Sequence, residues 1–128
     1  MFRTLIVEDH AVFRHSLNEM LSANFPLMDI AEASNGKDAL AQLDTFEPDL
    51  VFMDINLQDK NGLSLTKSIK TDYANTTVII MTLYDFPEYR QAALNAGASH
   101  FIPKDDFSEK RVLSLVKSVI ENNAKQAH

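Results

Sequence analysis

Leu50-Val51-Phe52-Met53-Asp54 is a short apolar run that ends in a carboxylate, and three more runs in the chain follow the same plan. These are Thr4-Leu5-Ile6-Val7 before Glu8-Asp9, Val78-Ile79-Ile80-Met81 before Thr82, and His100-Phe101-Ile102-Pro103 before Lys104. Continuous apolar runs of this length are typical of parallel strands that are covered on both faces. Because open α/β sheets bind ligands at the carboxyl ends of their strands, the four runs predict one pocket with three acids, a hydroxyl and an amine.

Segments with helical periodicity separate these runs, and the whole chain alternates between strand and helix. Two further strands are expected, over Met28–Ala33 and Ser99–Pro103. Helical periodicity predicts a first helix with Phe13, Leu17, Met20 and Leu21 on one face, and a later helix with Leu65, Ile69 and Tyr73 aligned. End signals predict three more helices: one capped by Asn35 that ends before Glu47, one from Pro87 to Gly97, and a last one with an Asp106–Glu109 capping box. Five strand–helix units predict a doubly wound, five-stranded parallel sheet, with Met28–Ala33 as an edge strand because it alternates.

Length and composition restrict the class of protein. The chain has 128 residues, which favours one domain, and we expect it to cover residues 1–121, with a polar, frayed tail over residues 122–128. A net charge of −6 argues against direct binding of nucleic acid, and the lack of cysteine excludes disulfides and thiol chemistry. With no apolar run of about 20 residues and no leader pattern, we expect a cytoplasmic domain that does not enter membranes.

The predicted acidic cluster suits a hard cation. At about 6 Å and an effective dielectric of ~20, each pair of carboxylates repels by about 2.8 kcal/mol, so such clusters hold either protons or a cation. Asp9 and Asp54 suit Mg²⁺, or Mn²⁺ in its place, and Glu8 suits a metal-bound water. The simpler alternative is that Glu8 and Asp9 only begin the first loop and cap the helix after it.

Asp54 is the candidate nucleophile, because a carboxylate can accept a phosphoryl group and form an acyl phosphate. Lys104 would supply a mobile positive charge and Thr82 a hydroxyl donor for the phosphoryl oxygens. Taken singly, a lysine or a threonine after a strand is common and would indicate nothing. The interpretation depends on all of these residues occurring together, in order, at strand ends.

With these residues in place, the chain resembles the receiver domain of two-component response regulators over essentially its whole length. The resemblance rests on Glu8-Asp9, Asp54, Gly62, Thr82 and Lys104. It implies the flavodoxin-like, CheY-like (βα)₅ three-layer sandwich with strand order 2-1-3-4-5. It also implies phosphorylation of Asp54 by a histidine kinase or a phosphotransfer protein. Metal ligands would be Asp9, Asp54 and the main-chain carbonyl of Asn56, and Phe101 would be the aromatic residue that switches with Thr82.

Finer details are similar to the NarL/FixJ-like subfamily. They are Asp9-His10, Phe13-Arg14, Asn95-Ala96-Gly97-Ala98 and Lys104-Asp105. Such receivers usually precede a helix-turn-helix domain, so the chain either stands alone or comes from a longer transcription regulator. The resemblance further implies a phosphoacceptor switch instead of a true enzyme, which assists its own phosphorylation and dephosphorylation. Its output face would combine the helix after Pro87, the strand Ser99–Pro103 and the last helix, and a phosphorylation-dependent homodimer is compatible with the family.

Some positions depart from the family pattern. Leu83 stands where a small residue is usual, and we expect it to narrow access to Asp54. Gln58 replaces a common proline, which predicts a less rigid turn after the acceptor, and Asp105 replaces a proline after Lys104. Tyr84 is placed to shield an acyl phosphate from water, although an exposed loop tyrosine is equally expected there.

Two other classes of protein share this topology. An aspartyl-phosphate phosphatase needs an Asp-x-Asp motif on its first strand, whereas that strand here leads into Glu8-Asp9-His10. A flavodoxin-type flavin binder needs a Ser/Thr/Gly-rich loop after the first strand, which this chain lacks. Formation of a phosphoryl adduct and turnover of a small phosphate ester distinguish the switch from the phosphatase.

Overall fold

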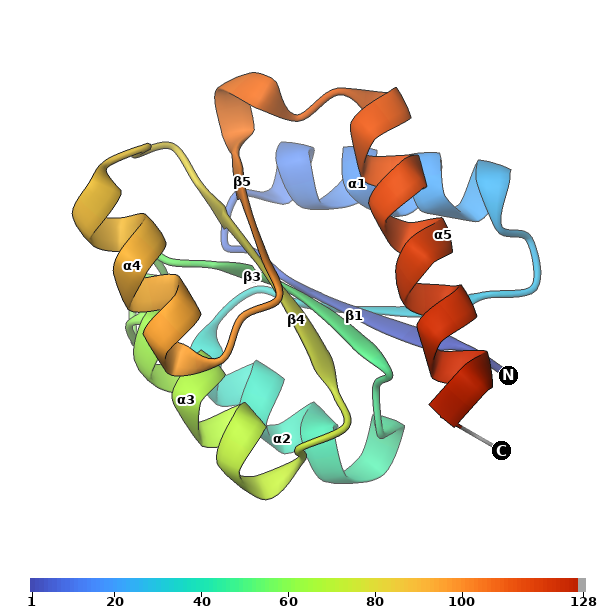
Figure 1. Cartoon of the computed structure of the whole chain (residues 1–128), viewed down its shortest axis with the longest axis horizontal. Coiled ribbons are helices and arrows are strands. Elements are labelled where there is room, and N and C mark those ends of the chain that lie inside the picture. Colours follow the sequence, from blue (N-terminus) through green and yellow to red (C-terminus); the bar gives the residue numbers. More distant parts are fainter. Residues whose placement is uncertain (127–128) are drawn as a thin grey trace.

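The computed structural model describes residues 1–126 and contains one sheet of five parallel strands (Figure 1). The strands are β1 (Arg3–Val7), β2 (Asp29–Ala33), β3 (Leu50–Asp54), β4 (Thr77–Thr82) and β5 (His100–Pro103). Their order is β2-β1-β3-β4-β5, so the predicted CheY-like topology is confirmed, including the edge position of the second strand. The second and fifth strands each begin one residue later than the sequence predicts.

Helices cover both faces of the sheet and give the three expected layers. They are α1 (Ala11–Asn24), α2 (Gly36–Phe46), α3 (Gly62–Asp72), α4 (Pro87–Ala96) and α5 (Glu109–Gln126). Figure 1 shows α1 and α5 on one face, and α2, α3 and α4 on the other. The two faces bury separate apolar clusters, one around Leu17, Leu21 and Val116 and the other around Leu43 and Ile69.

The central strands are inaccessible to solvent because a helical layer covers each face. Leu50, Val51, Phe52 and Met53 of β3 are all fully buried. Alternate residues of these strands face opposite layers, so a continuous apolar run is needed on β1, β3 and β4. Strand β2, at the edge, is mostly half-buried and tolerates Asp29 and Glu32.

Helix ends confirm two of the predicted signals and correct a third. The Asn35 side chain accepts a hydrogen bond from the Asp38 N–H, and Gly97 ends α4 with φ at 101°. The predicted Asp106–Glu109 capping box is wrong. Asp106 lies in a short 3₁₀ helix over Lys104–Asp106, and the Ser108 hydroxyl instead accepts from the Arg111 N–H at 3.2 Å. The 3₁₀ turn delays the start of α5 and moves the cap to Ser108.

The end of the chain also differs from expectation. Helix α5 continues to Gln126, so the part of the predicted polar tail that the structure describes is helical. Residues 127–128 lie outside it. Within residues 1–126, no helix combines the length and apolarity needed to cross a membrane.

Strand register brings the predicted site residues to one edge of the sheet. Val7 of β1 pairs with Met53 of β3, and Asp54 pairs with Met81 of β4. Thr82 then pairs with Pro103 of β5. Each strand therefore ends at nearly the same level, and the residues that follow meet above the sheet.

Candidate functional site: an acidic cluster with a buried lysine

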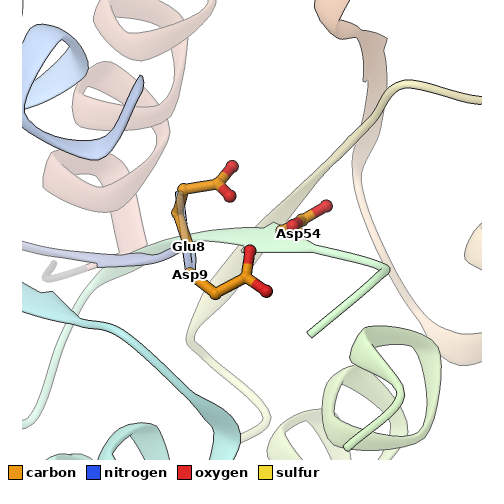
Figure 2. Close-up of side chains that lie close together, drawn as sticks. All are labelled: Glu8, Asp9 and Asp54. Atoms are coloured by element: carbon orange, nitrogen blue, oxygen red, sulfur yellow. The ribbon is translucent and has the colours of Figure 1, made fainter. Parts of the chain in front are cut away.

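Three carboxylates from two adjacent strands meet at this edge. Glu8 and Asp9 follow β1, and Asp54 is the last residue of β3 (Figure 2). One oxygen from each of the three side chains lies within 4.8 Å of the others. Glu8 is fully buried and Asp54 is 4% exposed, so water screens their mutual repulsion poorly. The predicted meeting of these three acids is present in the structure.

Lys104 places its ammonium group between two of these acids. Its Nζ lies 2.5 Å from Glu8 Oε1 and 3.7 Å from Asp54 Oδ2. The lysine side chain is only 11% exposed, and its Nζ also lies 4.8 Å from the centre of the Phe13 ring. The ammonium therefore neutralises part of the cluster and is close enough to Asp54 to contact a group attached to that carboxylate.

The main-chain N–H and both carboxylate oxygens of Glu8 have partners within the protein. Its N–H donates to the Ala33 carbonyl of β2 at 3.0 Å, and its Oε2 accepts from the His10 N–H at 3.0 Å. Among the described residues, Lys104 is the only partner of Oε1. A buried carboxylate with this many partners is fixed in place, which differs from an acid that only opens a loop.

Asp9 lies at the mouth of the cluster and experiences the remaining negative charge. Burial, followed by the hydrogen-bonding side chain and the charge of Glu8, raises the pKa of Asp9 above its ordinary value. Lys104 opposes this shift but does not reverse it. A cation bound at Asp9 would favour the ionised form, and a set of carboxylate oxygens this close together is one that a hard divalent cation such as Mg²⁺ takes.

The loop after Asp54 is attached to the start of α2 through Asp59. The carboxylate of Asp59 accepts hydrogen bonds from the N–H groups of Gly36 at 2.8 Å and Lys37 at 3.0 Å, at the start of α2. These two bonds hold the pKa of Asp59 below its ordinary value, and the bond from Gly36 has the larger effect. Sequence reasoning missed Asp59, although aspartate is a preferred residue for binding helix N-termini.

Asn56 and Gly62 complete the same loop. Asn56 forms an isolated bridge with Asn61, its N–H lies 3.4 Å from Asp54 Oδ1, and the Gly62 N–H donates to the Ile55 carbonyl at 2.8 Å. A Cβ atom at Gly62 would lie 2.1 Å from the Asp54 carbonyl oxygen. The start of α3 thus packs directly on the backbone of the candidate acceptor.

A cavity of about 360 Å³ opens beside Asp54. Leu83 and Tyr84 line it together with the acids and Lys104, and the narrowing of access by Leu83 stays a prediction. Thr82 is fully buried and does not line this cavity; its hydroxyl oxygen accepts from the Tyr84 N–H at 3.0 Å. That bond uses an acceptor position, so the hydroxyl hydrogen remains available as a donor.

Phe101 lies half-buried on β5 and contacts a residue that sequence reasoning missed. The guanidinium carbon of Arg90 on α4 lies 4.9 Å from the centre of the Phe101 ring. The Arg90 Nε also pairs with Asp85 Oδ1 at 2.6 Å, and this bond holds the pKa of Asp85 below its ordinary value. Arg90 therefore connects the loop after β4 to the aromatic ring that the sequence singled out. No sequence pattern marks it, because the contact joins separate elements.

Comparisons with known proteins agree with this geometry. Residues 4–117 match the response regulator receiver domain family. The chain is 36% identical over 109 residues to the transcriptional regulatory protein YdfI of Bacillus subtilis, covering 85% of this chain and 51% of YdfI. It is 31% identical over 105 residues to the DNA-binding transcriptional activator DevR/DosR of Mycobacterium tuberculosis, covering 82% of this chain and 48% of that protein. The chain thus spans about half the length of the curated relatives it matches.

Solved structures show the same fold. The signal receiver domain of a DNA-binding response regulator from Colwellia psychrerythraea superposes with a TM-score of 0.84 at 31% identity, covering 91% of this chain and 99% of that one. A CheY-like receiver domain from Methanospirillum hungatei gives 0.89 at 25% identity, covering 98% of each chain. The relatives are consistent with the NarL/FixJ-like subfamily. This chain belongs to the response regulator receiver domain family.

Proposed function

We propose that Asp54 accepts a phosphoryl group from a phosphohistidine of a sensor histidine kinase or a phosphotransfer protein. The observation that carries this proposal is the Lys104 ammonium, buried between Glu8 and Asp54 at 2.5 Å and 3.7 Å. Members of the receiver domain family interact with such donors. That this chain has a partner of this kind is our proposal. The 360 Å³ cavity gives the donor access to the Asp54 carboxylate.

In the reaction, a carboxylate oxygen of Asp54 attacks phosphorus while the phosphorus–nitrogen bond of the donor breaks. The bonding electrons leave with the imidazole nitrogen, and the product is an acyl phosphate on Asp54. Transfer of this kind depends mainly on positioning and on neutralisation of the equatorial oxygens. Lys104 is placed to neutralise one of them by moving from Glu8 toward the new group. The Thr82 hydroxyl hydrogen supplies a second contact after a small shift of the loop.

A divalent cation completes this proposal. Asp9, Asp54 and the main-chain carbonyl of Asn56 would hold Mg²⁺, or Mn²⁺, and Glu8 would orient a bound water. Burial, and then the hydrogen bond and charge of Glu8, raise the pKa of Asp9, and a bound cation would oppose that shift by favouring the ionised carboxylate. The bound cation would neutralise the attacking carboxylate and the phosphoryl oxygens. All other contacts in the transfer come from the chain itself.

The proposed output is a change of shape at α4, β5 and α5. Movement of Thr82 toward the phosphoryl group would change the loop that carries Tyr84 and Asp85. Because Asp85 binds Arg90, and Arg90 lies over Phe101, this movement would reach β5 through two described contacts. Because the relatives it resembles are transcription regulators, we propose that the chain is the receiver of such a regulator, a switch that assists its own phosphorylation and dephosphorylation and not a metabolic enzyme. Phosphorylation-dependent homodimerisation is one form that the output can take.

The proposal is tested with acetyl phosphate and Mg²⁺, followed by intact mass spectrometry. We expect one phosphoryl adduct per chain, which is lost when Mg²⁺ is removed with a chelator and when Asp54→Asn is introduced. Asp49→Asn provides a matched control, since Asp49 lies at the opposite end of β3 and accepts from the Arg3 N–H. Steady turnover of a small phosphate ester without an adduct would overturn the proposal and favour a phosphatase.

Tyr84 is expected to lengthen the life of the acyl phosphate. Its side chain lines the cavity beside Asp54, is 47% exposed, and stacks on Phe86 with ring centres 6.2 Å apart. Tyr84→Ala should therefore let water reach the phosphoryl group and speed dephosphorylation by about two- to tenfold, an effect of ~0.4–1.4 kcal/mol on the barrier. Decay of the adduct after removal of acetyl phosphate measures this rate. An unchanged rate would assign Tyr84 to the loop surface alone.

A further inference from the structure

Arg14 on α1 makes two hydrogen bonds that join the end of β1 to β2. Its Nη1 donates to the main-chain oxygen of Glu8 at 2.8 Å, and its Nε donates to Glu32 Oε1 at 2.6 Å. The side chain is 13% exposed, so both bonds are largely shielded from water. We infer that Arg14 is a positioning residue for the cation site, and this inference rests on the proposed function.

The peptide bond between Glu8 and Asp9 connects Arg14 to the cation site. The Glu8 carbonyl lies in one rigid plane with the nitrogen and Cα of Asp9, so the orientation of that carbonyl determines where the Asp9 side chain begins. On the other side of Glu8, its N–H is bound to the Ala33 carbonyl at 3.0 Å. With Arg14 on the carbonyl, Glu8 is held on both sides of its Cα.

Asp9 depends on this arrangement more than its neighbours do. Glu8 and Asp54 are both close to Lys104, whereas within residues 1–126 no hydrogen bond from another strand or helix reaches the Asp9 carboxylate. Its place in the cluster therefore follows from the backbone before it. Loss of the Arg14 bond would let the Glu8–Asp9 peptide rotate and move one of the proposed metal ligands.

Glu32 holds the Arg14 guanidinium in the position from which it binds the Glu8 carbonyl. Besides Arg14, its carboxylate accepts from Asn18 Nδ2 at 2.7 Å and lies 3.1 Å from His15 Nδ1. Burial disfavours ionisation of Glu32, but the hydrogen bonds from Asn18 and Arg14 outweigh it, and the pKa of Glu32 lies below its ordinary value. A planar guanidinium serves both acceptors at once, which a lysine ammonium does not.

The test measures binding of Mn²⁺ to the unphosphorylated protein by electron paramagnetic resonance of the free ion. Groups that orient metal ligands typically contribute 10- to 100-fold to affinity. We expect Arg14→Ala to weaken binding about tenfold, and Arg14→Lys to bind less tightly than the unmodified protein despite its retained charge. Glu32→Gln should act in the same direction and serves as the second variant if Arg14→Ala fails to fold. Arg111→Ala removes an exposed arginine from α5 and should leave affinity within about twofold.

Urea unfolding of the same variants separates positioning from general stability. A role only in stability would lower the unfolding midpoint and leave the Mn²⁺ affinity of the folded protein unchanged, and that result would overturn the inference. Arg14→Lys with full affinity would overturn it as well, because charge alone would then suffice. If the unmodified protein itself fails to bind Mn²⁺, the proposed function is contradicted. If the unmodified protein binds and Arg14→Ala binds equally well, only the present inference fails.

Discussion

Gly62→Ala is expected to abolish formation of the phosphoryl adduct and to lower the free energy of unfolding by about 3 kcal/mol or more. The added Cβ would lie 2.1 Å from the Asp54 carbonyl oxygen, 2.8 Å from the Asp54 carbonyl carbon and 2.8 Å from the Ile55 Cα. All three atoms are backbone, so relief requires movement of the segment that carries the acceptor. Intrinsic helix propensity alone would make the alanine variant more stable by about 1 kcal/mol. A measured loss in the free energy of unfolding would therefore show that the clash with the backbone outweighs helix propensity.

Gly36→Ala is the matched control for this prediction. Gly36 and Gly62 are both first residues of a helix and both follow a capping asparagine, Asn35 or Asn61. At Gly36 the closest atoms all belong to side chains, namely Cδ and Cβ of the exposed Lys60 at 2.8 and 2.9 Å and Cδ1 of Leu65 at 3.0 Å, and none approaches as closely as the Asp54 carbonyl oxygen does at Gly62. Urea unfolding should therefore show a much smaller loss for Gly36→Ala. Equal losses in the two variants would show that contact with the Asp54 backbone is not the cause.

The contrast between these glycines illustrates what the sequence could and could not predict. The sheet was predictable because β1, β3 and β4 are buried on both faces, which forces continuous apolar runs that few other structures tolerate. The meeting of Glu8, Asp9, Asp54 and Lys104 followed from the parallel order of those strands. The importance of Gly62 came from resemblance, and only the structure supplies the atom that it approaches.

The residues that sequence reasoning missed make contacts between elements far apart in the chain. Asp59 binds the start of α2, Arg90 lies over Phe101, and Arg14 joins Glu8 to Glu32. No periodicity or local spacing encodes such pairs. The wrong cap at Asp106 has a different origin, because Asp106 and Ser108 both satisfy local capping chemistry. The Ser108 N–H donates to the Asp106 carbonyl at 2.9 Å, which closes a turn and leaves Ser108 at the helix start.

Lys104→Met is expected to destabilise the unphosphorylated protein by about 3–5 kcal/mol, because it leaves the buried Glu8 carboxylate without its cation. Methionine keeps much of the apolar length of lysine beside Phe13, so the change mainly removes charge. Lys117→Met, at an exposed position of α5, controls for loss of a surface lysine and should have little effect. Chemical unfolding without divalent cations measures the difference.

Combining this change with Glu8→Gln gives the more discriminating experiment. A neutral amide no longer needs a cation, so Glu8→Gln with Lys104→Met should be more stable than Lys104→Met alone, with a coupling energy of about 1–3 kcal/mol. Additive losses would show that the 2.5 Å contact contributes little to folding and that Lys104 is retained for the phosphoryl group. Mg²⁺ should restore stability to Lys104→Met more than to the double variant, because a bound cation can replace the missing charge only where the Glu8 carboxylate remains. That last comparison connects folding to function, since the same negative charge that requires Lys104 in the resting protein would attract the cation for phosphoryl transfer.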